Sequence, residues 1–131
     1  MRILVIDDDP IFLYTTMRWL KARQFDVITA EDGCKALEEV KFNQPDLIIT
    51  DIMMPKMSGI ELVNYLHNDL NNKIPVILVS GMEEKAVIRE SFKLGPIDFF
   101  IKPFDYSHLL RVILRIENKI HYRNGLEGEV A

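Results

Sequence analysis

Short apolar runs alternate along the chain with longer segments in which apolar residues recur at every third or fourth position. The runs predict strands of a sheet that is covered on both faces, because aliphatic and β-branched residues follow one another with few polar interruptions. The predicted strands cover residues 2–6, 26–30, 47–50, 75–80 and 97–101. The segments that follow them predict helices over residues 10–23, 32–43, 58–70, 83–94 and 105–122.

Polar residues and proline mark where four of these helices begin. The predicted N-caps are Asp9, Asp32, Ser58 and Asp105. Pro10 directly after Asp9 suits the first helical position, where no backbone N–H is needed. Glu61 stands three residues after Ser58, and this spacing is that of a capping box. The chain is therefore expected to change direction after each strand through a short, capped loop.

Five strands in strict alternation with five helices predict an α/β fold, with helices on both faces of a parallel sheet. Right-handed crossovers leave few arrangements, and the flavodoxin-like order 2-1-3-4-5 is the commonest. We therefore expect a flavodoxin-like three-layer sandwich. In this order the chain reverses between strands one and three, and ligands bind at the carboxyl ends of strands beside that point. Those two strands end at Asp7-Asp8 and at Asp51.

Composition and charge narrow the class of protein. The 131 residues fit one domain, which we expect over residues 1–122, with residues 123–131 as a tail or linker. A net charge of -4 argues against direct nucleic-acid binding. No apolar stretch approaches the roughly 20 residues of a membrane span, and the start is too short before its acidic run for a signal peptide. The lone Cys34 suits a reducing cytoplasm.

Five polar residues stand at the carboxyl ends of four predicted strands: Asp7, Asp8, Asp51, Ser80 and Lys102. The predicted topology brings them to one edge of the sheet. Three neighbouring carboxylates repel one another unless a cation lies between them, and oxygen ligands suit Mg²⁺. Ser80 offers a hydroxyl and Lys102 an ammonium for phosphoryl oxygens, and an aspartate can itself be the nucleophile that accepts a phosphoryl group.

Each of these residues also has a simpler interpretation when it is taken alone. An acidic run such as residues 7–9 is typical of helix capping, and Asp9 is assigned to that role. Ser80 alone is typical of a turn, and Lys102 alone of a solvated surface. Their joint placement at neighbouring strand ends favours a site. The three histidines, His67, His108 and His121, fall on separate helices without the spacing of zinc ligands.

Four spaced motifs resemble the receiver domain of two-component response regulators over residues 1–122. The motifs are Asp7-Asp8, Asp51 with Pro55 and Gly59, Ser80-Gly81, and Lys102-Pro103-Phe104. The resemblance implies that Asp51 takes a phosphoryl group from a phosphohistidine on a histidine kinase or a phosphotransfer protein. It also implies a Mg²⁺ ion whose ligands are Asp8, Asp51 and the backbone carbonyl of Met53, with Asp7 acting through water.

The resemblance assigns further roles in the site. Ser80 and Lys102 would bind phosphoryl oxygens, the Lys102–Pro103 peptide bond would be cis, and Phe99 matches an aromatic switch position. Phosphorylation would then change the face formed by the fourth helix, the fifth strand and the fifth helix, where an output domain or partner docks. The chain would be a signalling receiver rather than an enzyme, with self-phosphorylation from small phosphodonors and slow self-dephosphorylation.

The last predicted helix carries an apolar stripe whose spacing alternates between four and three: Leu109, Ile113, Ile116 and Ile120. Such a stripe either covers the sheet or forms a heptad seam. In the second case the end of this helix would project and either self-associate as a homodimer or join a downstream helix. A homodimer through the face of the fourth helix, the fifth strand and the fifth helix is the other expected arrangement.

Two other function classes stay open at this point. A phosphatase with an aspartyl-phosphate intermediate also uses Asp and Mg²⁺, but that class has Asp-x-Asp at the nucleophile, whereas Ile52-Met53 follows Asp51 here. A receiver-like adaptor that is never phosphorylated would not need the acidic pair, Asp51 and Lys102. Labelling with a phosphodonor separates the adaptor from the receiver.

Overall fold

A single five-stranded parallel sheet forms the centre of the computed structural model, which describes residues 1–81, 89–90, 93, 95 and 98–130. The strands are β1 (Arg2–Ile6), β2 (Asp26–Ala30), β3 (Leu47–Asp51), β4 (Val76–Ser80) and β5 (Asp98–Ile101). Their order is β2-β1-β3-β4-β5, and each neighbouring pair is parallel. The predicted flavodoxin-like order is confirmed.

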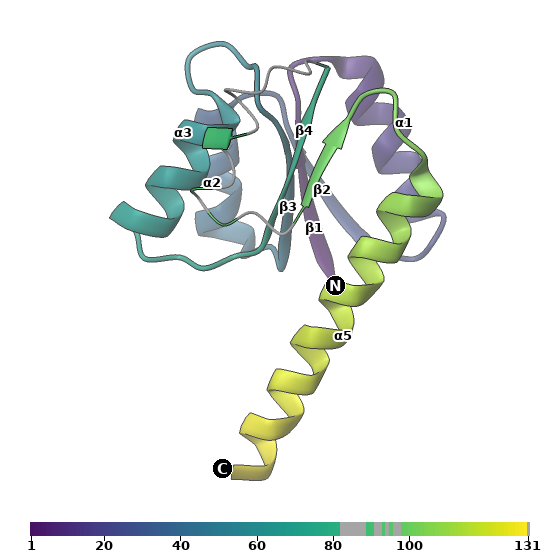
Figure 1. Ribbon diagram of the computed structural model, residues 1–131, viewed down its shortest axis with the longest axis vertical. Coiled ribbons are helices and arrows are strands. Elements are labelled where there is room, and N and C mark those ends of the chain that lie inside the picture. The colour runs from purple at the N-terminus through teal and green to yellow at the C-terminus, as the bar shows by residue number, and fades with distance from the viewer. Residues whose placement is uncertain (82–88, 91–92, 94, 96–97, 131) are drawn as a thin grey trace.

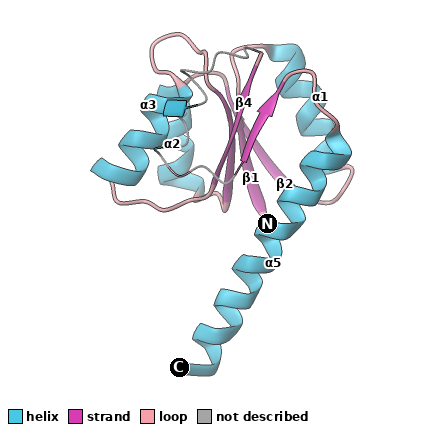
Figure 2. Ribbon diagram, viewed as in Figure 1, coloured by secondary structure: helices cyan, strands magenta, loops and turns pink. Residues whose placement is uncertain are grey.

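Helices cover both faces of this sheet. They are α1 (Pro10–Lys21), α2 (Gly33–Asn43), α3 (Gly59–Asn64) and α5 (Tyr106–Val130). Figures 1 and 2 show α1 and α5 on one side of the strands and α2 and α3 on the other. The three-layer sandwich is thus confirmed. The predicted fourth helix over residues 83–94 lies outside the described residues, apart from residues 89, 90 and 93, which are helical.

The core lies in two layers, one on each side of the sheet. Ile3 and Val5 of β1 pack toward α1 and α5, whereas Leu4 and Ile6 pack toward α2 and α3. All four side chains are fully buried. Because successive side chains of a strand point to opposite faces, a strand covered on both sides needs an apolar residue at every position. The uninterrupted apolar runs of the sequence follow from this geometry.

The four predicted N-caps are all confirmed. Each capping side chain accepts a hydrogen bond from a backbone N–H in the first turn: Asp9 from Ile11 at 2.9 Å, Asp32 from Lys35 at 2.9 Å, Ser58 from Glu61 at 3.1 Å and Asp105 from Ser107 at 2.8 Å. These bonds satisfy N–H groups that have no partner within the helix. The caps Asp9 and Ser58 fix where α1 and α3 begin after the loops that follow β1 and β3.

The third helix departs from a uniform α-helix in its second half. We expected one helix over residues 58–70, but α3 is followed by a π-helical turn over Tyr65–Asp69. There the backbone N–H of Leu70 donates to the carbonyl of Tyr65 at 3.0 Å, a step of five residues. Periodicity in the sequence did not predict this extra residue in the turn.

The expected end of the last helix near Tyr122 is wrong, because α5 continues to Val130. Asn124 and Gly125, which indicated a linker, lie within the helix. A glycine costs about 1 kcal/mol in a helix interior but does not end it, since it keeps its backbone N–H. The division into a domain over residues 1–122 and a tail stays a prediction.

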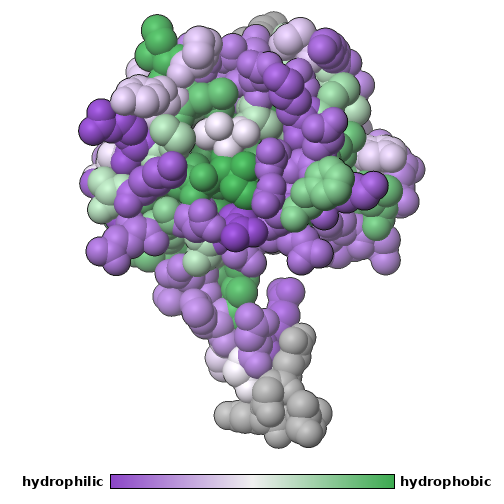
Figure 3. All heavy atoms as spheres, turned by 180° about the vertical axis from the view of Figure 1, so that it is seen from behind, coloured by the Kyte–Doolittle hydropathy of each residue, from purple (hydrophilic) through white to green (hydrophobic). Residues whose placement is uncertain are grey.

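The carboxyl part of α5 projects beyond the sheet, away from the body of the domain (Figure 1). Figure 3 shows mainly hydrophilic side chains on this projection. Among the described residues, no helix combines the length and the apolar character needed to cross a membrane.

The apolar stripe of α5 packs against the sheet. Leu109, Ile113 and Ile116 are buried in the core layer shared with α1, and Ile120 is half-buried beside them. The first three are therefore occupied by the domain's own core. This outcome favours the interpretation that the stripe covers the sheet, and a homodimer through this helix stays a prediction.

Candidate functional site

Three carboxylates meet at the carboxyl edge of the sheet. Asp7 and Asp8 directly follow β1, and Asp51 is the last residue of β3. The two strands are neighbours, and their register pairs Ile6 with Thr50, so that Asp7 and Asp51 lie level with each other. Carboxylate oxygens of the three aspartates lie within 4.8 Å of one another. The structure thus brings together the acidic residues that the topology predicted.

Burial of Asp51 sets the electrostatics of this cluster. Asp51 as a whole residue is 8% exposed, and Asp7 is fully buried beside it. Burial, and then the negative charge of Asp7, raise the pKa of Asp51 to about 6, although Lys102 and the backbone N–H groups of Ile52 and Met53 act in the opposite direction. The negative form of Asp51 is therefore disfavoured in the protein alone, and an added cation would stabilise it.

Lys102 supplies a positive charge at the edge of the cluster. Its Nζ lies 2.7 Å from Oδ2 of Asp7, while Oδ1 of Asp7 accepts a hydrogen bond from the backbone N–H of Asp9 at 2.9 Å. Both oxygens of Asp7 therefore have a partner from the protein. The peptide bond from Lys102 to Pro103 is cis, as predicted.

Ser80 and Phe99 lie on the next two strands. Ser80 ends β4 and is fully buried, and its carbonyl accepts a hydrogen bond from the backbone N–H of Lys102 at 2.8 Å. Since β3 and β4 pair Asp51 with Val79, Ser80 stands one residue beyond the level of Asp51. Phe99 of β5 is half-buried and packs against the core layer of α2 and α3. Ser80 thus stands at the strand end next to that of Asp51, whereas Phe99 lies one strand further and within the sheet.

The loop after Asp51 packs closely against the strand that it leaves. A Cβ atom on Gly59 would lie 2.3 Å from the carbonyl oxygen of Asp51, and the backbone N–H of Gly59 donates to the carbonyl of Ile52 at 2.9 Å. Only a residue without a side chain allows this approach. Met53 lies in this loop and is 55% exposed. Gly59 therefore holds the loop that carries the predicted metal-binding carbonyl.

The donor set of this edge fits a hard divalent cation. Asp7, Asp8 and Asp51 offer only oxygen atoms, Asp8 is exposed to solvent, and Mg²⁺ keeps several waters while it binds few protein groups. Within the described part of the chain, these aspartates are the only group of His, Cys, Asp or Glu residues close enough to hold a metal ion. His67 instead hydrogen-bonds the carbonyl of Ile74, and the ring of His108 packs on Phe100.

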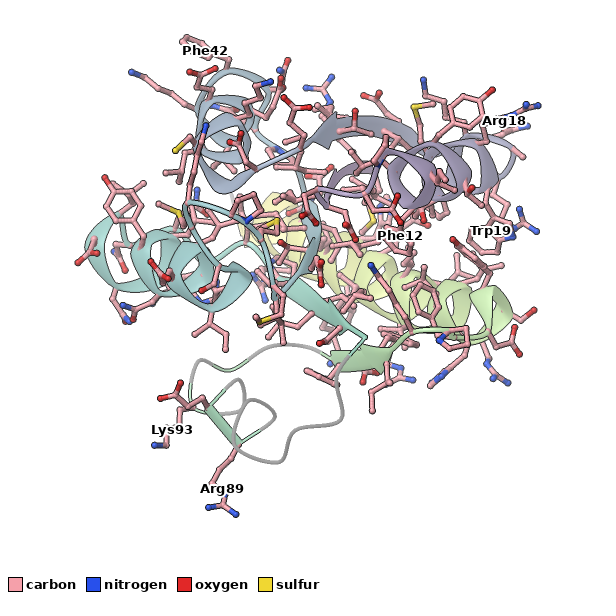
Figure 4. The ribbon with its side chains drawn as sticks, turned by 90° about the horizontal axis from the view of Figure 1, so that it is seen from above. Phe12, Arg18, Trp19, Phe42, Arg89 and Lys93 are labelled. Atoms are coloured by element: carbon pink, nitrogen blue, oxygen red, sulfur yellow. The ribbon has the colours of Figure 1, made fainter. Side chains whose placement is uncertain are left out.

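Phe12 is a residue of the site that sequence reasoning missed. Its ring centroid lies 4.1 Å from Nζ of Lys102. Figure 4 shows Phe12 on α1, on the side of that helix that faces α5. In the sequence, Phe12 resembles any other apolar residue of the amphipathic helix predicted over residues 10–23. The two residues are ninety positions apart in the sequence, so no local pattern linked them.

Comparisons with curated proteins point to one family. The model of the response regulator receiver domain matches residues 3–114. The chain is 35% identical over 109 residues to the transcriptional regulatory protein PrrA of Mycobacterium tuberculosis, covering 83% of this chain and 46% of the relative. It is 34% identical over 117 residues to the alkaline phosphatase synthesis transcriptional regulatory protein PhoP of Bacillus subtilis, covering 87% and 48%. The chain spans about half the length of these relatives.

Solved structures agree with this match. The Francisella response regulator 1452 receiver domain superposes with a TM-score of 0.82 at 31% identity, covering 90% of this chain and 98% of that one. The Vibrio cholerae chemotaxis protein CheY4 superposes with a TM-score of 0.80 at 27% identity, covering 88% and 97%. The similarity therefore spans nearly the whole of each solved chain.

Proposed function

Since this chain belongs to the receiver domains of response regulators, which are signalling proteins and not classical enzymes, we propose that it is switched by phosphorylation of Asp51. The observation that carries the proposal is the setting of Asp51. This carboxylate is almost buried at the end of β3, with oxygens of Asp7 and Asp8 within 4.8 Å and the ammonium of Lys102 on Asp7. An aspartate on the solvated surface would have neither this burial nor these charged neighbours.

The proposed reaction transfers a phosphoryl group from a phosphohistidine of a histidine kinase or phosphotransfer protein. A carboxylate oxygen of Asp51 attacks the phosphorus, the new O–P bond forms, and the P–N bond to the imidazole breaks. The imidazole nitrogen keeps the electron pair and takes up a proton. The product is an acyl phosphate on Asp51.

Lys102 and Ser80 would stabilise the charge that collects on the phosphoryl oxygens. The ammonium of Lys102 already lies at the acidic edge, and Ser80 stands at the adjacent strand end. Charge-assisted hydrogen bonds of this kind are worth about 1.5–3 kcal/mol each. Lys102 would exchange its bond to Asp7 for one to the phosphoryl group.

The residues that would hold Mg²⁺ are Asp8, Asp51 and the backbone carbonyl of Met53, with Asp7 acting through water. When bound, this ion neutralises the carboxylates and the incoming phosphoryl oxygens. The raised pKa of Asp51 supports a role for such a cation, because burial and Asp7 make the ionised form that attacks less favourable than it is in water.

The proposed signal leaves the site through Ser80 and Phe99. Movement of Ser80 toward the phosphoryl group would vacate space near β5, and Phe99 would rotate inward. This would change the face made by the predicted fourth helix, β5 and α5, where an output domain, a partner or a second copy would dock. Since the curated relatives extend well beyond the matched region, an attached output domain is part of the proposal. We also propose that the domain works in the cytoplasm.

Phosphorylation by a small phosphodonor with Mg²⁺ tests this function. The parent chain should gain one phosphoryl group by intact mass, and Asp51→Asn should gain none. Asp9→Asn is the matched control, because Asp9 caps α1 next to the same cluster and is expected to keep full loading. Equal loading of Asp51→Asn and the parent would refute the assignment. No loading of any variant would favour the adaptor.

A further inference from the structure

The ammonium of Lys102 touches two groups of opposite character. On one side it is bonded to Asp7, at 2.7 Å from Oδ2. On the other side it lies over the ring of Phe12, 4.1 Å from the ring centroid. A cation within about 6 Å of an aromatic centroid is attracted to the negative face of the ring. The charge of Lys102 is therefore held between a carboxylate and an aromatic face.

Lys102 has room to leave this position. Its side chain is 25% exposed, and a cavity of about 420 Å³ opens beside it. The cavity is lined by Phe12, Lys102, Pro103, Phe104 and Tyr106. A lysine side chain has much rotamer freedom to lose when it is held in one place. An attraction that already confines the ammonium therefore reduces the conformational entropy that Lys102 still has to lose when a phosphoryl group binds.

The ring of Phe12 is itself fixed by its neighbours. It packs edge-on against Phe104, with centroids 6.1 Å apart and an interplanar angle of 77°. Phe104 in turn packs on Tyr106 at 5.2 Å, and the hydroxyl of Tyr106 is 2.8 Å from that of Thr16 on α1. The aromatic contacts thus run from the loop after β5 back to the helix that carries Phe12. These contacts hold the ring of Phe12 in place beside Lys102.

We propose that Phe12 is a positioning residue that holds the ammonium of Lys102 at the acidic edge through its aromatic face. This inference rests on the proposed function of the site and adds a residue to it. An aliphatic side chain of similar size would fill the same space but would offer no negative face to the charge. The two explanations, positioning and filling of space, therefore predict different results for aliphatic and aromatic replacements.

Binding of beryllofluoride, a phosphoryl mimic, with Mg²⁺ measures the effect. Phe12→Leu should weaken binding about two- to five-fold, the ratio that corresponds to about 0.5–1 kcal/mol for a partly exposed cation–π contact. Phe12→Tyr should keep the parent affinity because it keeps the ring. In a Lys102→Met background, Phe12→Leu should cause no further loss, since the ring would act through the ammonium.

Tyr14→Leu is the matched control. Tyr14 is an exposed aromatic residue of the same helix, with the guanidinium of Arg18 5.7 Å from its ring. Figure 4 shows Arg18 on the side of α1 that faces away from α5. The Tyr14→Leu change should leave beryllofluoride binding unchanged. Parent-like affinity of Phe12→Leu, or an equal loss in the Lys102→Met background, would overturn the proposal.

A spectroscopic readout on the parent protein does not depend on any variant folding. Protons on the ε-carbon of Lys102 should resonate upfield of those of the other lysines, because the ammonium nitrogen bonded to this carbon lies over the face of Phe12. Phe12→Leu should remove this shift. A normal shift in the parent would refute the positioning role even if Asp51 is phosphorylated. Failure of the parent to bind beryllofluoride together with a clear upfield shift would instead refute the proposed function alone.

Discussion

At the amino end of the sheet, Arg2 of β1 lies between two aspartates. Its Nε is 2.7 Å from Oδ2 of Asp26, its backbone N–H donates to Asp46 at 2.8 Å, and its Nη1 donates to the carbonyl of Asn43 at 2.6 Å. The side chains of Arg2 and Asp26 are 42% and 60% exposed. At the carboxyl end, Asp7, Asp8 and Asp51 lie together, the ammonium of Lys102 is bonded to Asp7, and Asp7 and Asp51 are almost fully buried.

The difference between these ends shows how a functional cluster can be told from a structural one. At the amino end, the charged groups have partners and reach water, so that none of them needs a ligand. At the carboxyl end, negative charge exceeds positive charge in a buried place, and this arrangement costs free energy until a cation binds. The carboxyl edge, which holds the proposed site, is therefore expected to lower the stability of the domain as long as no cation is bound.

The largest effect on stability is expected for Gly59→Ala. The new Cβ would lie 2.3 Å from the carbonyl oxygen of Asp51, a contact that the backbone must relieve by moving. Overpacking of this kind costs about 3 kcal/mol. Urea denaturation of the parent and the variant measures it.

Gly125→Ala is the control for this prediction. Gly125 lies on the exposed part of α5, and its Cβ would meet nothing within 4 Å. Replacing a helical glycine with alanine should raise the free energy of unfolding by about 0.5–1 kcal/mol. A Gly59→Ala protein as stable as the parent would mean that the loop after β3 is not tightly packed.

Asp51→Asn should stabilise the protein at neutral pH in the absence of divalent cations. Because the folded state raises the pKa of Asp51 from 3.8 to about 6, the parent loses stability as the pH rises from about 4, and the loss levels off only above the folded-state pKa of about 6. The variant lacks this loss. The difference should approach about 3 kcal/mol at pH 7 and vanish below pH 4.

The measurement is the free energy of unfolding of both proteins from pH 3.5 to 7.5 with a chelator present. Asp26→Asn at the amino end is the matched control, and it should show no such gain. If the free energies of unfolding of Asp51→Asn and the parent differed by the same amount over this range, the loss of stability could not be assigned to the charge of Asp51.

Mg²⁺ should stabilise the parent by binding to the folded state alone. At a free concentration of ten times the dissociation constant, the gain is about 1.4 kcal/mol. Asp8→Asn should reduce the gain because Asp8 offers an exposed oxygen ligand, whereas Asp9→Asn should keep it. Thermal unfolding with and without Mg²⁺ measures this, and an equal gain in Asp8→Asn would exclude Asp8 as a ligand.

The features that depend on local pattern were predicted well. The strands, the N-caps Asp9 and Ser58, and the edge where Asp7 and Asp51 meet follow from periodicity, from hydrogen-bonding capacity and from the topology of parallel sheets. Each of these rules involves only neighbours in sequence or neighbouring strand ends.

The features that depend on distant packing were not predicted. The contact of Phe12 with Lys102 joins residues ninety positions apart. The need for glycine at position 59 comes from the backbone of Asp51, which becomes its neighbour only when the loop closes. The length of α5 was underestimated because Gly125 indicated an end, although glycine disfavours a helix only weakly.

The smallest effect is expected at the amino end of the sheet, for Asp26→Asn. This change removes the charge opposite Arg2, but both side chains are exposed, and Arg2 keeps its bonds to Asn43 and Asp46. Exposed pairs contribute at most about 1 kcal/mol, and salt weakens them further. The variant should therefore lose less than about 1 kcal/mol at low salt and almost nothing at high salt, as measured by urea denaturation. A loss above about 2 kcal/mol that salt does not reduce would mean that the amino end also depends on a buried charge pair. The contrast between the two ends would then lie in the sign of the net charge rather than in access to water.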